Sequence, residues 1–225
     1  MRPSRLSVIY WTGTAACFAG AVAMLIVYTP VEPTMGPIQK MLYLHWPVAI
    51  DAFAACFVVF VASIGYLWQR EERWDDLAVA ASNVAAVYCA AVLVTGVLWA
   101  RSVWGVWWIW SPRLTFSLVL FLLYVGYLAL RPLVPAERRA VVSAGYGIAA
   151  FVDVPLVFLS VKLMPDVHPT SITLAPAMKL TLAVWFVPIT LIMGGLIATQ
   201  FGLNRRRHAV GGPGPVPVRP RETLA

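Results

Sequence analysis

Residues 46–69 read WPVAIDAFAACFVVFVASIGYLWQ, an apolar run in which Asp51 is the one acidic or basic side chain. A helix rises about 1.5 Å per residue, so a helix of this length crosses the roughly 30 Å hydrocarbon core of a bilayer. Lipid offers no partner to backbone N–H and C=O groups, which a spanning segment must therefore satisfy within itself. The run predicts a transmembrane helix, and it sets the length to look for elsewhere in the chain.

More apolar runs of similar length lie on either side of this one. They span residues 7–29, 77–100, 114–131, 141–163 and 176–201. Hydrophobic residues make up 60% of the 225 residues, charged residues 12%, and the mean hydropathy is +0.78, which leaves too little polar surface for a water-soluble globule. We expect an all-α polytopic membrane protein, with six transmembrane helices in an antiparallel bundle with short loops over residues 1–202. A disordered, basic, Gly/Pro-rich tail should follow over 203–225.

Positive charge is distributed unevenly between the two sides of the predicted bundle. The net charge of +7 comes mostly from Lys and Arg that flank the apolar runs, so we attribute it to membrane orientation and exclude a nucleic-acid partner. The side with both termini and the connectors 70–76 and 131–140 carries twelve of these residues, and the opposite side carries five. The positive-inside rule predicts an inner-membrane protein with both termini in the cytoplasm. The connectors 30–45, 101–113 and 164–175 then face outward together.

The three cysteines, Cys17, Cys56 and Cys89, lie far apart within apolar runs. The sequence contains neither a CxxC pair nor a CxxCH haem-attachment site. This excludes a thiol oxidoreductase and a chain that is itself a c-type cytochrome. The first apolar run follows Arg2 and Arg5 as in a signal peptide, but it lacks a small-x-small cleavage site, so we expect it to remain as an anchor.

Two of the three histidines lie on the predicted outer side, His45 at the start of the second helix and His168 in the loop after the fifth. Between them lies Trp104-Gly-Val-Trp-Trp-Ile-Trp110, with four tryptophans in seven residues. A single tryptophan at this level is typical of the aromatic belt that anchors helices at a membrane interface. Four in one loop favour a flat aromatic platform for a planar apolar ligand. His208 belongs to the predicted cytoplasmic tail and is given no role.

Haem is the ligand that combines these requirements, because its iron accepts axial imidazole nitrogens and its porphyrin needs broad apolar contact. Zinc usually takes three or four protein ligands, and the outer loops contain no cysteine. The haem propionates favour nearby cations, for which Arg101, Arg113, Lys40 and Lys179 are candidates. The alternative for each of these four is an ordinary interfacial role at a helix end.

The segment Trp104-Gly-Val-Trp-Trp-Ile-Trp-Ser-Pro-Arg-Leu-Thr115 resembles the WWD signature of the haem-handling proteins of cytochrome c biogenesis. The size and span count resemble the CcmC (haem exporter protein C) family. Tyr43-Leu-His-Trp-Pro47 is similar to the first histidine motif of this family. Asp153-Val-Pro155 followed by Ser160-Val-Lys162 is similar to the run that leads to the second, with His168 in the matching loop. The three elements occur in the family's order, and the likeness covers most of the chain.

The resemblance implies that His45 and His168 are the axial ligands of a haem iron. It also implies that the tryptophan loop cradles the porphyrin edge, with haem b bound transiently as cargo. The residues of this loop expected to bind haem are Trp104, Gly105, Trp107, Trp108, Trp110 and Arg113. One position departs from the signature: Ser111 stands where the family has an aspartate, which removes an acceptor or charge partner for Arg113.

The function implied by the resemblance is to present haem, on the periplasmic side, to the haem chaperone CcmE, which acquires it covalently. The implied partners are CcmD and the ABC-type subunits CcmA and CcmB, within membrane lipid. This chain contains no GxxxxGK[ST] phosphate-binding loop, so we expect ATP hydrolysis to belong to a partner. A haem-lyase-like transfer step would then proceed here without nucleotide hydrolysis by this chain.

Two other functions fit parts of the sequence. One is a b-type cytochrome that conducts electrons, although such proteins usually ligate haem within their helices and here both histidines lie at or beyond helix ends. The other is a small-molecule transporter with a site near the bilayer midplane. Its support is Asp51 and Asp153, because an ionisable group within a span is costly. We expect both acids to serve helix packing or ligand orientation instead, and Pro155 to kink the fifth helix.

Overall fold

The computed structural model describes residues 4–164, 168 and 173–211, without the side chains of 208–211. Every regular element in this part of the chain is a helix, and six segments are long and apolar enough to cross a membrane, which confirms the all-α, six-span prediction. The short 3-10 helices η1 (Pro37–Met41) and η2 (Arg131–Leu133) extend the second and fourth spans. The α-helices are α1 (Arg5–Val27), α2 (Leu42–Gln69), α3 (Glu72–Trp104), α4 (Pro112–Leu130), α5 (Ala136–Phe151), α6 (Asp153–Leu163) and α7 (Pro176–Gly211), and α5 and α6 together form the fifth span.

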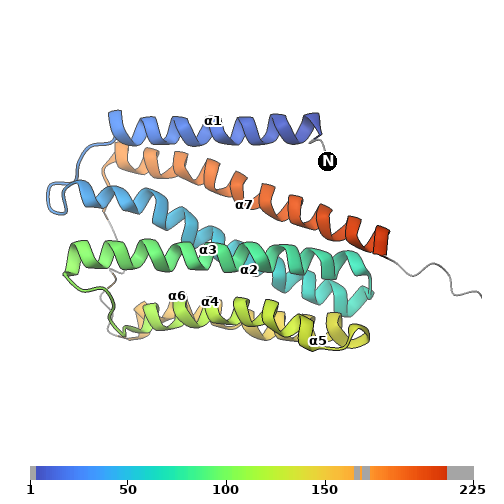
Figure 1. The fold of residues 1–225 in the computed structure, drawn as a ribbon. Helices are drawn as coiled ribbons and strands as arrows, with labels where there is room; N and C mark the ends of the chain where they lie inside the picture. Colours follow the sequence, from blue (N-terminus) through green and yellow to red (C-terminus); the bar gives the residue numbers. More distant parts are fainter. Residues whose placement is uncertain (1–3, 165–167, 169–172, 212–225) are drawn as a thin grey trace, which may run out of the picture.

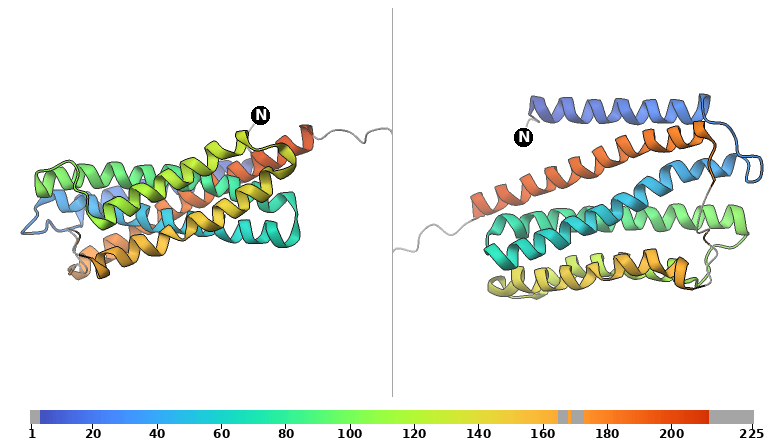
Figure 2. Two further views of the ribbon diagram at one scale, coloured as in Figure 1. Left: turned by 90° about the horizontal axis from the view of Figure 1, so that it is seen from below. Right: turned by 180° about the vertical axis from the view of Figure 1, so that it is seen from behind.

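The helices are stacked in successive layers (Figures 1 and 2). In the central layer α2 and α3 pack along each other, and both contact helices on either side. One face of this layer is covered by α7, with α1 outside it, and the other by α4 together with α5 and α6. Because α1 packs mainly against α7, most of its surface stays exposed, as expected for a helix that faces lipid.

The two ends of the bundle carry different connections. The N-terminus, the end of α7 and the α2–α3 and α4–α5 connections lie at one end, whereas α2, α4 and α7 begin at the other (Figures 1 and 2). We call these the Asp75 end and the His45 end, after residues in the first turns of α3 and α2. The predicted outer connectors thus share the His45 end, although 165–167 and 169–172 lie outside the described residues.

The fifth span is broken, where the sequence predicted one helix over 141–163. It begins earlier, at Ala136, and α5 ends at Phe151 before α6 starts at Asp153. Pro155 explains the break, because it has no N–H to donate to the carbonyl of Phe151 and its ring crowds that oxygen. A proline is tolerated in the first turn of a helix, so the chain resumes its helical path immediately.

Small residues bring the neighbouring helices close together. Ala55 and Ala62 of α2 and Ala81 of α3 are completely buried. An added Cβ on Gly147 of α5 would lie 2.7 Å from the Oγ of Ser63 in α2, so a larger residue there would displace its neighbours. Close backbone approach is the main source of attraction between helices in lipid, since lipid tails are as apolar as the side chains.

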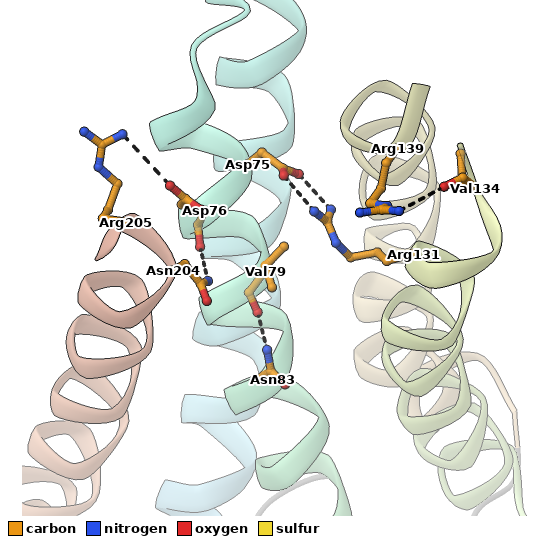
Figure 3. A network of polar contacts seen from close by, with 9 residues as sticks. All are labelled: Asp75, Asp76, Val79, Asn83, Arg131, Val134, Arg139, Asn204 and Arg205. Atoms are coloured by element: carbon orange, nitrogen blue, oxygen red, sulfur yellow. Dashed lines mark hydrogen bonds and ion pairs between the residues drawn. The ribbon is translucent and has the colours of Figure 1, made fainter. Parts of the chain in front are cut away.

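Polar contacts join three helices at the Asp75 end (Figure 3). Arg131, after the end of α4, donates two hydrogen bonds to the carboxylate of Asp75 in α3, both at 2.7 Å. The side chains of this pair are only 17% and 12% exposed. On the other side of α3, Asn204 of α7 donates to the backbone carbonyl of Asp76 at 3.1 Å, and Arg205 lies 4.0 Å from the Asp76 carboxylate.

These contacts explain why α7 is longer than its apolar run. The sequence placed the end of the membrane domain at 202, but the helix continues to Gly211. Hydropathy decreases after 202, whereas the buried side chain of Asn204 still packs against α3 and keeps the chain helical there. Residues 212–225 lie outside the described residues, so a disordered tail stays a prediction.

Candidate functional site

A cavity lies at the His45 end between α2, α3, α4 and α6. His45, Arg113 and His168 all line it, and its volume is about 150 Å³. Apart from these three, the walls are mostly apolar, with Phe53 from α2 and Phe158 from α6 among them. The fold therefore places two imidazoles that are far apart in the sequence on one cavity, together with a cation.

Three residues on one face of α3 surround the His45 ring: Thr95, Gly96 and Trp99. The Nδ1 atom of His45 lies 2.7 Å from the Oγ1 of Thr95. The ring of Trp99 meets the imidazole edge-on, with 5.7 Å between centroids. Gly96 leaves room for the ring, since an added Cβ would lie 3.3 Å from Cε1 of His45. Residues three and four apart are neighbours on a helix surface, so these positions together form a cradle for the imidazole.

His168 lies against the last residue of α3. Its ring meets Trp104 edge-on, with 5.6 Å between centroids, and its side chain is half-buried. His168, Arg113 and His45 line the same cavity. Arg113 lies in the first turn of α4, where its guanidinium adds a positive charge to the cavity. A cation beside two imidazoles suits a ligand that carries carboxylates.

The tryptophan segment begins with a glycine cap. Gly105 ends α3 in the left-handed conformation, with φ 74°, and its N–H donates to the carbonyl of Arg101 at 3.2 Å. The Arg101 guanidinium in turn donates to the Gly105 carbonyl and lies over the ring of Trp107, 5.4 Å from its centroid. Glycine is favoured here because a Cβ penalises positive φ.

Ser111 caps the helix on the other side of this segment. Its hydroxyl accepts a hydrogen bond from the Leu114 N–H at 3.5 Å, and Pro112 occupies the first helical position of α4. Serine and aspartate are both favoured N-caps, because each presents an oxygen to the unpaired N–H groups of the first turn. At this position Ser111 therefore performs the capping that an aspartate would perform, without its charge.

The predicted site residues fall into two groups. His45, Arg113 and His168 line the cavity, and Trp104 contacts His168. Among the described residues, the lining does not include Gly105, Trp107, Trp108 or Trp110. Trp108 and Trp110 pack edge-on at 5.5 Å, and the side chains of Trp107 and Trp110 are 58% and 73% exposed.

The other three candidate cations do not line the cavity. Lys40 donates to the carbonyl of Leu25 at 2.8 Å and so ties η1 to the end of α1. Arg101 is held by Gly105 and Trp107, and Lys179 does not line the cavity. Of the four cations considered from the sequence, Arg113 is the one that the fold places at the site.

The two acids within the spans lie outside the cavity. Both carboxylate oxygens of Asp51 lie 3.1 Å from the Oγ1 of Thr190, which donates to them and links α2 to α7. Asp153 is buried at the start of α6, next to the break in the fifth span. Asp51 thus makes a helix-packing contact, as expected of it from the sequence.

Sequence reasoning missed Thr95 and Gly96. Both lie within an apolar run, where neither a threonine nor a glycine is unusual, and nothing in the run marks them as neighbours of His45. The sequence contains one signal that could have identified them. Both lie about one helical turn before Trp99, which places all three residues on one helix face.

Comparisons with known proteins identify the family of this chain. A sequence model of the family described as heme exporter protein C matches residues 3–210. The heme exporter protein C of Paracoccus denitrificans is 32% identical over 211 residues, which cover 88% of this chain and 86% of that protein. That of Escherichia coli K12 is 35% identical over 159 residues, covering 68% and 64%, and that of Haemophilus influenzae is 26% identical over 207 residues, covering 91% and 83%. The chain therefore belongs to the heme exporter protein C family.

Proposed function

We propose that this protein binds haem b between His45 and His168 and presents it to the haem chaperone CcmE during the maturation of c-type cytochromes. The observation that carries the proposal is the shared cavity, lined by both histidines and by Arg113. The name of the related proteins, heme exporter protein C, supports haem as the cargo.

Each part of the cavity matches a part of haem. The two imidazoles supply nitrogen donors for the axial positions of the iron. Arg113 supplies a charge-assisted hydrogen-bond donor for a propionate. The apolar walls, with Phe53 and Phe158, accept the porphyrin surface.

The size of the cavity favours transient binding. Its volume of about 150 Å³ is below the roughly 300–1,000 Å³ of typical small-molecule sites, so part of the porphyrin would lie outside it. The tryptophan segment, with the exposed rings of Trp107 and Trp110, would contact this outer part. An exposed haem edge is accessible to a chaperone, whereas an electron carrier would keep its haem within the bundle.

We further propose that the His45 end faces the periplasm and the Asp75 end the cytoplasm, with both termini inside. The excess of Lys and Arg on the side of the termini supports this orientation. CcmD and the ABC-type subunits CcmA and CcmB are the proposed membrane partners. ATP hydrolysis belongs to one of them, because this chain has no phosphate-binding loop. The proposed haem-handling domain ends with α7, later than the boundary at 202 predicted from the sequence, and the basic tail follows it.

The direct test is haem binding by the full chain purified in detergent. Soret absorbance is titrated with haem for the wild type, His45→Ala, His168→Ala and the double variant, and thermal unfolding checks that each is folded. His208→Ala is the matched control, since it removes the third histidine, to which the sequence gives no role in the site. We expect weaker binding in each single variant, loss in the double variant and no change in the control. Unchanged haem content in the double variant would refute the proposal.

A second measurement separates presentation from storage. Haem-loaded protein is mixed with CcmE, and covalently bound haem on CcmE is followed by its absorbance after denaturation. Transfer that requires His45 and His168 is the expected result. A stable, reversible redox couple without any transfer would favour the electron-carrier alternative.

A further inference from the structure

Thr95 makes three close polar contacts through a single hydroxyl group. Its Oγ1 lies 2.7 Å from the carbonyl oxygen of Ala91, one turn earlier in α3, and 3.2 Å from that of Val92. The same oxygen lies 2.7 Å from Nδ1 of His45. A hydroxyl has one hydrogen and a carbonyl can only accept, so the Thr95 hydrogen is donated along its own helix. Toward His45, the oxygen is therefore left with a lone pair.

This arrangement determines which ring nitrogen of His45 carries a proton. A lone pair on Thr95 can accept only from an N–H, so Nδ1 is the protonated nitrogen. In a neutral imidazole the second nitrogen, Nε2, then keeps its lone pair, which is the form that binds a metal. The position of Thr95 thus selects one of the two neutral tautomers.

We propose that Thr95 is a positioning residue for haem binding: it accepts the Nδ1–H of His45 and thereby offers Nε2 of that ring to the iron. The inference rests on the proposed function, since it takes haem as the cargo. Histidines that bind metals usually donate their other ring N–H to an oxygen acceptor, which fixes the ring and raises its basicity. Thr95 would do this from α3, and it is not among the residues that line the cavity.

The neighbours of Thr95 restrict the ring further. Gly96 lies close enough to Cε1 that even a methyl group would press on the imidazole, and Trp99 meets the ring from its edge. The hydroxyl of Thr95 is itself held by the backbone of α3, so its orientation does not depend on a bound ligand. The acceptor is therefore already in place before haem binds.

Two substitutions isolate the hydroxyl. Thr95→Val keeps the branched shape and removes the acceptor, whereas Thr95→Ser keeps the acceptor. Thr14→Val in α1 is the matched control, because the buried Thr14 makes the same bond to the carbonyl one turn earlier, Tyr10 O at 2.9 Å, in a helix that does not line the cavity. All variants are made in the full chain and purified in detergent.

The first measurement needs no haem. Nuclear magnetic resonance of protein labelled with ¹⁵N-histidine distinguishes a protonated from an unprotonated ring nitrogen, and His45→Ala assigns the signals. We expect protonated Nδ1 and bare Nε2 for His45 in the wild type and in Thr95→Ser, and a mixture of tautomers in Thr95→Val. A wild-type His45 with bare Nδ1 would overturn the inference whether or not the protein binds haem.

The second measurement uses the haem titration and the midpoint potential of the bound haem. Thr95→Val should bind haem about 10- to 100-fold more weakly, the range found when such acceptors are removed. Its potential should rise, because a less basic imidazole stabilises ferric iron less. Thr95→Ser and Thr14→Val should match the wild type. Unchanged affinity and potential in Thr95→Val overturn the role of Thr95. Failure of the wild type to bind haem, with Nδ1 still protonated, refutes the proposed function and with it the role toward haem.

Discussion

Ser111 and Gly105 fix the two ends of the segment that joins α3 to α4. Gly105 ends α3 because its positive φ is tolerated without a side chain, and Ser111 begins α4 because its hydroxyl accepts from the first turn. The exposed tryptophans between them are therefore held at both ends by local backbone chemistry. The serine in place of the aspartate of the WWD signature keeps this cap and omits one negative charge beside Arg113.

Substitutions at Ser111 test its role as the N-cap of α4. Ser111→Ala should lower the free energy of unfolding by about 1 kcal/mol, because it leaves the Leu114 N–H without its acceptor. Ser111→Asp should stay close to the wild type, since aspartate caps equally well. Thermal unfolding in detergent measures both. Equal destabilisation by alanine and aspartate would show that the cap does not determine stability here.

Gly105→Ala tests the other end of the segment. The left-handed conformation should cost about 1–2 kcal/mol once a Cβ is present. Gly20→Ala is the matched control, because Gly20 lies within α1 with open space around an added Cβ, and alanine should stabilise it by about 0.5–1 kcal/mol. Opposite signs in the two unfolding measurements are expected. A neutral Gly105→Ala would contradict the role of the positive φ.

The sequence predicted the two histidines and the arginine that line the cavity, but not the residues that contact them. His45 and His168 could be named because both lie on one predicted membrane face beside a tryptophan cluster, and Arg113 was one of four candidate cations for the haem propionates. Trp107 and Trp110 were expected at the ligand because four tryptophans in one loop favour an aromatic platform, yet they lie outside the cavity lining. Thr95 could not be found, because its importance depends on the rotation of α3 against α2, which composition does not encode.

α3 is the element that connects the two ends of the molecule. It carries Asp75 in its first turn, the cradle of His45 toward its other end, and Trp104 as its last residue. It also packs against α2, α4 and α7. Any shift of α3 along its axis would therefore alter the position of Thr95 relative to His45.

The pair formed by Asp75 and Arg131 should hold α3 and α4 in register. Arg131→Met should destabilise the protein by about 3–5 kcal/mol, because it leaves a nearly buried carboxylate without its partner. The double variant Asp75→Leu/Arg131→Met should recover most of this loss, since no charge remains to be compensated. Thermal unfolding in detergent compares the three proteins. A double variant as unstable as Arg131→Met would contradict this explanation.

The existence of the helices followed from the sequence, but their ends did not. Hydropathy detects where a chain can enter lipid, so all six spans were predicted. It does not detect the turns beyond the lipid that are held by tertiary contacts. α3 runs on to Trp104 and α7 to Gly211, and the break at Val152 lies inside an apolar run. Pro155 indicated a kink there, and the structure shows the interruption itself.

The two ends of the helix bundle carry different groups of polar residues. The His45 end carries the cavity lined by His45, Arg113 and His168. The Asp75 end carries the ion pairs that join α3 to its neighbours (Figure 3). The proposed orientation depends on the distribution of Lys and Arg along the sequence.

Cysteine labelling tests that orientation. In a protein whose own cysteines are replaced, Val31→Cys should react with a membrane-impermeant maleimide added to intact spheroplasts, because Val31 is 51% exposed at the His45 end. Leu133→Cys, 80% exposed at the Asp75 end, should react only after permeabilisation. The reverse pattern would place the cavity on the cytoplasmic side.

The most direct measurement of the shared-iron proposal is electron paramagnetic resonance of the ferric haem bound to the full chain. Two axial imidazoles should give the low-spin signal of six-coordinate iron in the wild type. His45→Ala and His168→Ala should each lose that signal or convert it to high spin, and added free imidazole should restore it. A low-spin, bis-imidazole signal that persists in either single variant would contradict ligation of one iron by His45 and His168.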